Sequence, residues 1–272
     1  MTTATAPDYA AITQRQRKVW SAGDFARIGS TTLLPGELLC ESLDVLPGER
    51  VLDVAGGHGN AALAAARRFC EVTATDFVSE LLDLAERRAA LEHLPLTVRV
   101  ADAQALPFPD ESYDAVISTF GAMFAPDQER TAAELLRVCR SRGRIGMTNW
   151  RPDSFIGDVF RTIAAHVPPP PGVRPPLEWG DQRRVRELLG PGVQSLSFKP
   201  RELVWRFGSP DHMLDYFQRW YGPTNVAFAA LDDQGQEELA HDLLGVYTQH
   251  NRAGDAAMVA PSEYVEVIAV KA

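Results

Sequence analysis

A glycine-rich segment in the first quarter of the chain has the residue types that hold a nucleotide-like ligand. Gly56, Gly57 and Gly59 follow a short apolar run and precede an alanine-rich stretch within residues 51–68. From Gly57 onwards, the sequence Gly-His-Gly-Asn-Ala-Ala matches G-x-G-x-x-A, one form of the dinucleotide fingerprint. Asp76 lies about where an NAD enzyme places its ribose-binding acid. The segment alone therefore predicts a nucleotide-type ligand and leaves open whether this is a dinucleotide or another molecule.

Further features on the neighbouring segments narrow this choice. Asp53 precedes the glycines in DVAGGHG, Asp102 begins an Asp-Ala pair after the apolar run LTVRV, and the stretch LPFPDESYDAV follows. These features, in this order and spacing, resemble the class I S-adenosylmethionine-dependent methyltransferases. The resemblance is closer to the small-molecule group related to the ubiquinone and menaquinone biosynthesis enzymes, and it covers residues 48–150. Two positions depart from the family pattern: Ala55 replaces its usual first glycine, and His58 stands where a small residue or threonine is frequent.

The resemblance implies that the ligand is S-adenosylmethionine. Amide groups of the glycine loop would meet the carboxylate of its amino-acid end, and Asp76 would accept hydrogen bonds from both ribose hydroxyls. The resemblance places Asp102 at the exocyclic amine of the adenine. Asp53 has two roles that stay open at this point, a bond to the loop amides or a bond to the ligand. The predicted cofactor-binding residues are Ala55, Gly56, Gly57, Asn60, Asp76, Phe77, Asp102, Ala103, Thr119 and Phe120.

Short apolar runs alternate with amphipathic helical segments through the middle of the chain. Strands are expected at residues 50–55, 71–77, 96–103, 113–120 and 143–150, and helices at 60–69, 79–91 and 127–140. This alternation predicts an α/β protein with a Rossmann-like, doubly wound, mostly parallel sheet, for which we expect seven strands. In such a sheet, ligands bind outside the carboxyl ends of the strands.

The rest of the chain departs from this alternation. Further helices are expected at residues 9–20, 23–29, 35–46, 181–190, 209–222 and 235–251. Residues 193–207 are expected to form two strands about a turn at Lys199 and Pro200, and residues 263–272 a last strand that closes the sheet. The predicted division is an N-terminal helical lid at 1–47, a Rossmann-like core at 48–151 and 191–272, and an inserted Pro-rich and helical cap at 152–190.

Large apolar side chains lie in the regions that cover the cofactor in related enzymes, which favours a small, apolar or aromatic methyl acceptor. The predicted acceptor wall consists of Trp20, Phe25, Met123, Phe124, Trp150, Trp179 and Tyr221, although such side chains are also usual in a core. A general base is needed only where the acceptor loses a proton as it attacks. The catalytic residues are left unknown, with His58, His166 and Tyr221 as candidates and His212, Tyr216 and Glu178 behind them. No metal is expected, because the six histidines lack HExxH or HxH spacing.

Composition limits the remaining partners. The chain has 272 residues and a net charge of −9, which argues against a nucleic-acid surface. Three scattered cysteines are typical of reduced thiols in a cytoplasmic protein, and no apolar run suggests membrane insertion. A homo-oligomer is left open.

The sequence thus predicts a cytoplasmic methyltransferase that methylates oxygen, nitrogen or carbon of a small-molecule acceptor by in-line displacement. One alternative is an NAD-dependent oxidoreductase, which rests on the G-x-G-x-x-A match and the acid at Asp76. The other is a non-methylating member of the same fold, either a cyclase-like catalyst or a cofactor-binding partner protein.

Overall fold

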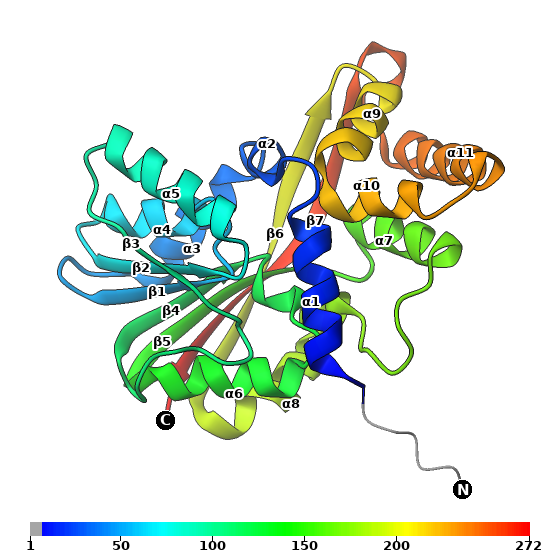
Figure 1. Ribbon diagram of the computed structural model, residues 1–272. Helices are drawn as coiled ribbons and strands as arrows, with labels where there is room; N and C mark the ends of the chain where they lie inside the picture. The colour runs from blue at the N-terminus through cyan, green and yellow to red at the C-terminus, as the bar shows by residue number, and fades with distance from the viewer. Residues whose placement is uncertain (1–6) are drawn as a thin grey trace, which may run out of the picture.

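One twisted sheet of seven strands organises the chain, as the computed structural model of residues 7–272 shows (Figure 1). The strands are β1 (Arg50–Val54), β2 (Glu71–Asp76), β3 (Thr97–Val100), β4 (Tyr113–Thr119), β5 (Cys139–Trp150), β6 (Val193–Phe207) and β7 (Met258–Lys271). Their order is β3-β2-β1-β4-β5-β7-β6. The first five strands are mutually parallel, whereas β7 is antiparallel to both β5 and β6. The predicted fold class is confirmed.

Helices cover both faces of the sheet. The helices on one face are α3 (Leu33–Leu43), α4 (Asn60–Ala66) and α5 (Ser79–Leu91), and those on the other are α6 (Gln128–Val138) and α8 (Gln182–Leu189). Because both faces are covered, the central strands are apolar throughout: Val51, Leu52 and Val54 of β1 are all buried. The side chains of α4 between its ends are alanines and one leucine, and all of them are buried, which lets this helix lie close to β1 and α3.

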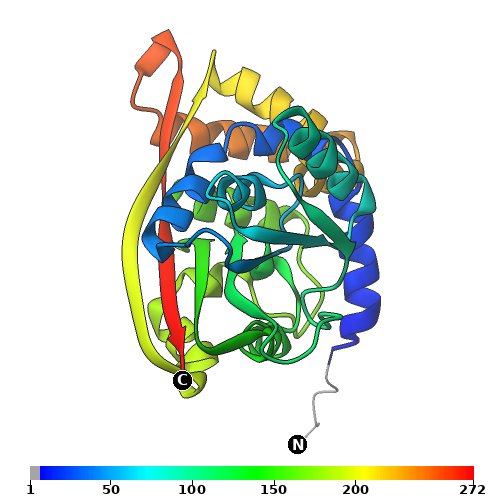
Figure 2. The same ribbon diagram turned by 90° about the vertical axis from the view of Figure 1, so that its left-hand side faces the viewer.

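The remaining helices gather at the end of the sheet where the parallel strands end (Figures 1 and 2). They are α1 (Tyr9–Trp20), α2 (Phe25–Gly29), α7 (Phe155–His166), α9 (Pro210–Trp220), α10 (Gly222–Ala229) and α11 (Asp233–His250). Helix α1 packs against α10, α2 against α9, and α7 against α11, so segments far apart in the sequence form one layer. The strand order reverses between β1 and β4, which is where a doubly wound sheet opens a crevice for a ligand.

One expectation about the second half of the chain is wrong, and two helices there were not expected. Residues 193–207 form the single strand β6, with Pro200 in its middle, and not two strands about a turn. Proline is tolerated there because β6 is an edge strand, in which a residue without an N–H can face away from its neighbour. Helices α7 and α10 were not predicted at all.

The predicted lid, core and cap remain a proposed division of the chain. Residues 1–6 of the predicted lid lie outside the described residues. Within the predicted cap, α7 borders the crevice, whereas α8 packs on the face of the sheet beside α6. Helix α9, assigned to the core, also borders the crevice.

Candidate functional site

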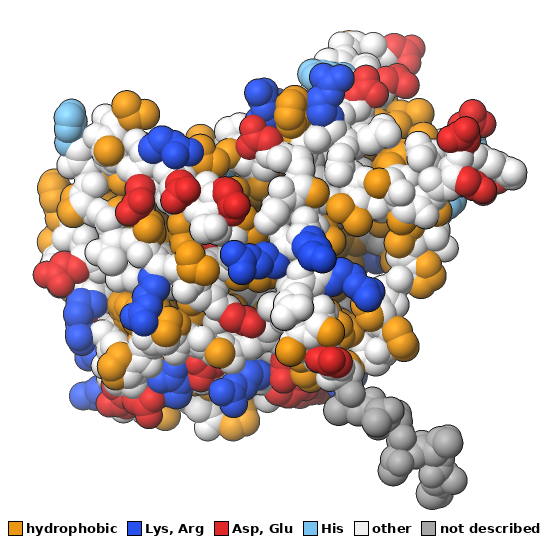
Figure 3. Space-filling model, in the orientation of Figure 1, with side chains coloured by type: hydrophobic (Ala, Val, Ile, Leu, Met, Phe, Trp, Pro, Cys, Tyr) orange, Lys and Arg blue, Asp and Glu red, His pale blue; other side chains and the backbone are white. Residues whose placement is uncertain are grey.

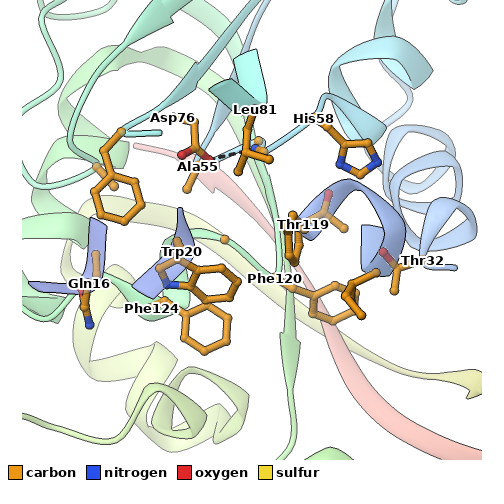
Figure 4. Close-up of a pocket in the computed structure, with 18 of the residues that line it drawn as sticks. Gln16, Trp20, Thr32, Ala55, His58, Asp76, Leu81, Thr119, Phe120 and Phe124 are labelled. Carbon is orange, nitrogen blue, oxygen red and sulfur yellow. Dashed lines mark hydrogen bonds between the residues drawn. The ribbon is translucent and has the colours of Figure 1, made fainter. Parts of the chain in front are cut away.

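A cavity lies at the carboxyl ends of the parallel strands, between the sheet and the layer of helices. It encloses about 1290 Å³ of empty space, including the solvent at its mouth. All ten residues predicted to bind the cofactor line it, which brings the ends of β1, β2, β3 and β4 together with the start of α4. Figure 4 shows Asp76 and Ala55 on one side of this space and the rings of Trp20 and Phe124 on the other. The cavity therefore has two halves of different chemistry, which we call the loop half and the aromatic half.

The glycine loop of residues 55–59 gives the loop half its shape. Gly57 and Gly59 have φ angles of +57° and +88°, in the left-handed region that favours glycine. A Cβ atom on Gly56 would lie 2.5 Å from the Oδ2 atom of Asp53, so only a glycine fits over this carboxylate. Ala55 also has a positive φ, of +52°, which costs an alanine roughly 1 kcal/mol. The substitution of alanine for the family's first glycine is therefore a strained one.

Two buried carboxylates hold this loop. Asp53 Oδ2 accepts a hydrogen bond from the Ala62 amide at 2.9 Å. Asp76 accepts one bond at each oxygen, from the amides of Gly57 and Val78, both at 2.9 Å. Burial raises the pKa of Asp53 to about 7 and that of Asp76 to about 6, because a charge is poorly solvated there.

The other oxygen of Asp53 identifies the kind of ligand that fits. Asp53 Oδ1 is buried and has no hydrogen-bond partner among the described residues. The Thr119 hydroxyl, on the same cavity, is also unpaired within residues 7–272. An unpaired buried carboxylate oxygen is compensated by a cationic hydrogen-bond donor. S-adenosylmethionine carries an ammonium group and a sulfonium, so the residues present fit this cofactor.

Gln104 is a site residue that the sequence analysis missed. Its backbone N–H and its side-chain amide both donate to Asp102 Oδ1 at 2.9 Å. The same amide donates to the Thr13 hydroxyl on α1 at 2.9 Å, and Gln104 also lines the cavity. One side chain thus ties the predicted adenine-binding acid to the first helix. No local sequence pattern predicts the contact between Gln104 and Thr13, because the two residues are 91 positions apart.

His58 packs between the glycine loop and α2. A Cβ atom on Gly29 would lie 2.0 Å from the His58 ring, and the ring of Phe25 meets that of His58 edge-on at 6.1 Å. Asn60 adds a hydrogen bond from its side-chain amide to the Gly29 carbonyl, at 2.8 Å. Burial, with the nearby charge of Arg88, lowers the pKa of His58 to about 4. The imidazole is therefore neutral at pH 7, and its contacts join α2 to the loop.

The aromatic half is assembled from several elements. Trp20 of α1 meets Phe25, Phe124 and Tyr221 with centroid distances of 5.4, 4.9 and 5.7 Å. Phe120, which follows β4, stacks on Trp150 at 3.9 Å and is held at a φ of +56°. The members that the sequence analysis missed are Ile28, Ile156, Val159, Phe160, Trp205 and Phe217.

Several predicted residues do not line the cavity. Met123 and Trp179 are fully buried in the core instead. His166 pairs at 2.8 Å with Asp242, which lines a separate surface hollow between α7 and α11. The three further candidates for a base are likewise elsewhere: His212 accepts from the Gly208 amide, Tyr216 donates to the Arg27 carbonyl, and Glu178 pairs with Arg174.

Two absences hold for the described part of the chain, residues 7–272. No three histidine, cysteine or acidic side chains come together there in a way that could hold a metal ion. None of the helices there combines the length and the apolar character needed to cross a membrane.

Comparison with known proteins identifies the family. Residues 52–147 match the family model described as a methyltransferase domain. The chain is 42% identical over 220 residues to the uncharacterized protein Rv1403c of Mycobacterium tuberculosis, covering 80% of both chains. It is 38% identical over 168 residues to the demethylmenaquinone methyltransferase of Deinococcus radiodurans, covering 60% of this chain and 64% of that one.

A solved structure shows the same fold. The YcgJ protein of Bacillus subtilis superposes with a TM-score of 0.60 at 16% identity, covering 87% of this chain and 97% of that one. The sheet order, the glycine loop with its buried acids, and these similarities all agree. The chain belongs to the class I S-adenosylmethionine-dependent methyltransferases and uses S-adenosylmethionine as its methyl donor.

Proposed function

We propose that this methyltransferase binds S-adenosylmethionine in the loop half and methylates oxygen, nitrogen or carbon of a small, largely apolar or aromatic acceptor in the aromatic half. The observation that carries the proposal is the contrast across one cavity. The side with Asp53 and Asp76 offers buried carboxylates, one of them with an unpaired oxygen. The opposite side consists mostly of rings and aliphatic side chains, with the amide of Gln16 beside them (Figure 4).

The bound cofactor supplies a methyl group on a sulfonium, so an in-line displacement breaks the sulfur–methyl bond and forms a bond from the methyl carbon to the acceptor. The residues of the chain position the two reactants. In this proposal, Asp76 accepts from the ribose hydroxyls and Asp53 Oδ1, which is otherwise unpaired, accepts from the ammonium group. The ring of Phe120, which is stacked on that of Trp150, would contact the acceptor at the end of β4.

None of the described groups that line the cavity is suited to remove a proton in the aromatic half. The pKa of His58, at about 4, makes this imidazole a weak base. Burial raises the pKa of Tyr221, so its phenol stays protonated. Positioning is therefore the main contribution of the chain to the rate. An acceptor atom that carries a proton would release it to solvent.

The first test is calorimetry with S-adenosylhomocysteine on the full chain. We expect binding at micromolar concentrations and a higher melting temperature in its presence. A melting temperature raised by NADH but not by S-adenosylhomocysteine would favour the dehydrogenase alternative. Binding without transfer of labelled methyl to any apolar or aromatic acceptor in a panel would favour a non-methylating member of the fold.

A further inference from the structure

The side chain of Gln104 is held in one orientation by partners from three segments. It lines the cavity and is 8% exposed. Its oxygen accepts from the backbone N–H of Asp127, just before α6, at 3.0 Å. Its NH2 group donates to the Thr13 hydroxyl and to the Asp102 carboxylate, both at 2.9 Å. A backbone N–H can only donate and a carboxylate can only accept, so the Gln104 amide cannot turn over. The direction of its two N–H bonds is therefore fixed.

This fixed amide decides how Asp102 can accept further hydrogen bonds. Asp102 Oδ1 accepts at 2.9 Å from both the backbone N–H and the side-chain amide of Gln104. The same amide nitrogen lies 3.0 Å from Asp102 Oδ2, so one N–H is shared by the two oxygens. A carboxylate oxygen has two lone pairs. Both lone pairs of Oδ1 are thus used by Gln104, and Oδ2 keeps one for a further donor.

Helix α1 covers Gln104 at this end of the cavity. The outer side of the helix faces solvent with exposed Arg15, Arg17 and Lys18, and acidic and basic side chains are interspersed around it (Figure 3). Thr13 lines the cavity from the same helix and accepts the second N–H of Gln104. Water therefore has little access to the Gln104 amide, and both of its N–H groups are already bonded within the chain.

We propose that Gln104 is a positioning residue that fixes the Asp102 carboxylate as the acceptor for the amino group of the cofactor's adenine. The proposal rests on the proposed function, because it takes the adenine to lie at Asp102. Without Gln104, the carboxylate keeps only its bond from the backbone N–H and is free to turn about its side-chain bonds. Gln104 does not need to touch the adenine, since it acts through Asp102.

The chain offers a matched control in Gln16. This residue also lines the cavity, from α1, and is half-buried. The side-chain amide that donates to Asp102 is that of Gln104 and not that of Gln16. Gln104→Leu and Gln16→Leu therefore remove the same group from two places on one cavity wall, and only the first releases the Asp102 carboxylate.

The experiment measures the preference for the amino group by calorimetry on the full chain. The probes are S-adenosylhomocysteine and its analogue in which a hydrogen atom replaces the amino group of the adenine. Wild type should bind the first about 10- to 100-fold more tightly, as one hydrogen bond to a charged group provides. Gln104→Leu should reduce this ratio at least about fivefold, and Gln16→Leu should keep it. General damage to the cavity would weaken both probes alike and leave the ratio unchanged.

Three outcomes overturn the proposal: equal affinity of wild type for the two probes, an unchanged or larger ratio in Gln104→Leu, or the same loss of the ratio in Gln16→Leu. A failure of the proposed function would differ from all three, because wild type would then not bind S-adenosylhomocysteine at all. Should Gln104→Leu fail to fold, Gln104→Met decides instead. Its flexible side chain has a similar length and no N–H, so it should reduce the ratio in the same way.

Discussion

The two halves of the cavity are held together by different kinds of contact. In the loop half, backbone amides and strand-end acids hold one another: the Gly57 and Val78 amides donate to Asp76, and the Ala62 amide donates to Asp53. In the aromatic half, the contacts are between side chains from helices and strands far apart in the sequence, such as Trp20 against Phe124.

Because of this difference, a substitution has different consequences in the two halves. A substitution in the loop half disturbs the backbone itself, since glycine is required next to Asp53. A substitution in the aromatic half changes the shape of a wall while the strands beneath it stay in place. A substitution in the aromatic half can therefore change the choice of acceptor without disturbing the loop half.

The largest expected effect is on Asp76, because its two oxygens hold the loop as well as face the cavity. Asp76→Ala should weaken binding of S-adenosylhomocysteine about 30- to 150-fold, or about 2–3 kcal/mol, as measured by calorimetry. Asp83→Ala, which removes an exposed acid on α5, should bind as wild type does. An affinity of Asp76→Ala within threefold of wild type would contradict a ribose contact.

A second prediction concerns pH. With a pKa of about 7, Asp53 is about one-tenth ionised at pH 6 and nine-tenths at pH 8. In the proposed binding mode the ionised form pairs with the ammonium group, so affinity for S-adenosylhomocysteine should rise about tenfold between these pH values. Asp76, with a pKa of about 6, should add a further loss of affinity below pH 6. Asp53→Asn should flatten the profile between pH 6 and 8, and a flat wild-type profile would exclude this pairing.

The strain in the loop half gives a smaller effect on folding. Ala55→Gly removes the cost of a left-handed alanine and should raise the free energy of unfolding in urea by about 0.5–1 kcal/mol. Ala133→Gly, at an exposed position inside α6, should lower it by about 1 kcal/mol. The two alanine-to-glycine substitutions should therefore change the free energy of unfolding in opposite directions. A loss of stability in both variants would show that the positive φ of Ala55 carries no strain.

The smallest effect is expected where the two halves meet. Thr13→Val removes the hydroxyl that accepts from the Gln104 amide and keeps the side-chain shape. Hydrogen exchange of the amides in α1 should become faster, because this helix loses its hydrogen bond to the loop half. Affinity for S-adenosylhomocysteine should change by no more than about threefold, since about 0.5–1 kcal/mol is what one partly exposed hydrogen bond contributes. Unchanged exchange in α1 would show that other contacts hold the helix.

How much the sequence predicts also differs between the halves. Most of the lining of the loop half was predicted, because its members sit at strand ends or in the glycine pattern, whereas Gln104 was missed because it belongs to neither. The aromatic half was predicted only in part, because Trp205 and Phe217 reach it from strand and helix positions with no motif. Met123 and Trp179 share the residue types of the wall but face the core, and the direction of such a side chain depends on packing between distant elements.

Pro200 misled the sequence analysis about β6, and the same residue has a consequence for the behaviour of the protein in solution. A long strand at the border of a sheet offers its free N–H and C=O groups to any other extended chain and so invites aggregation. β6 is such a strand, of 15 residues, and near its centre it has a proline beside the exposed Lys199. A proline interrupts the row of donors, and a lysine must lose water before a second strand can add there. Pro200→Val should thus leave the sheet within each chain intact and make this border prone to strand addition.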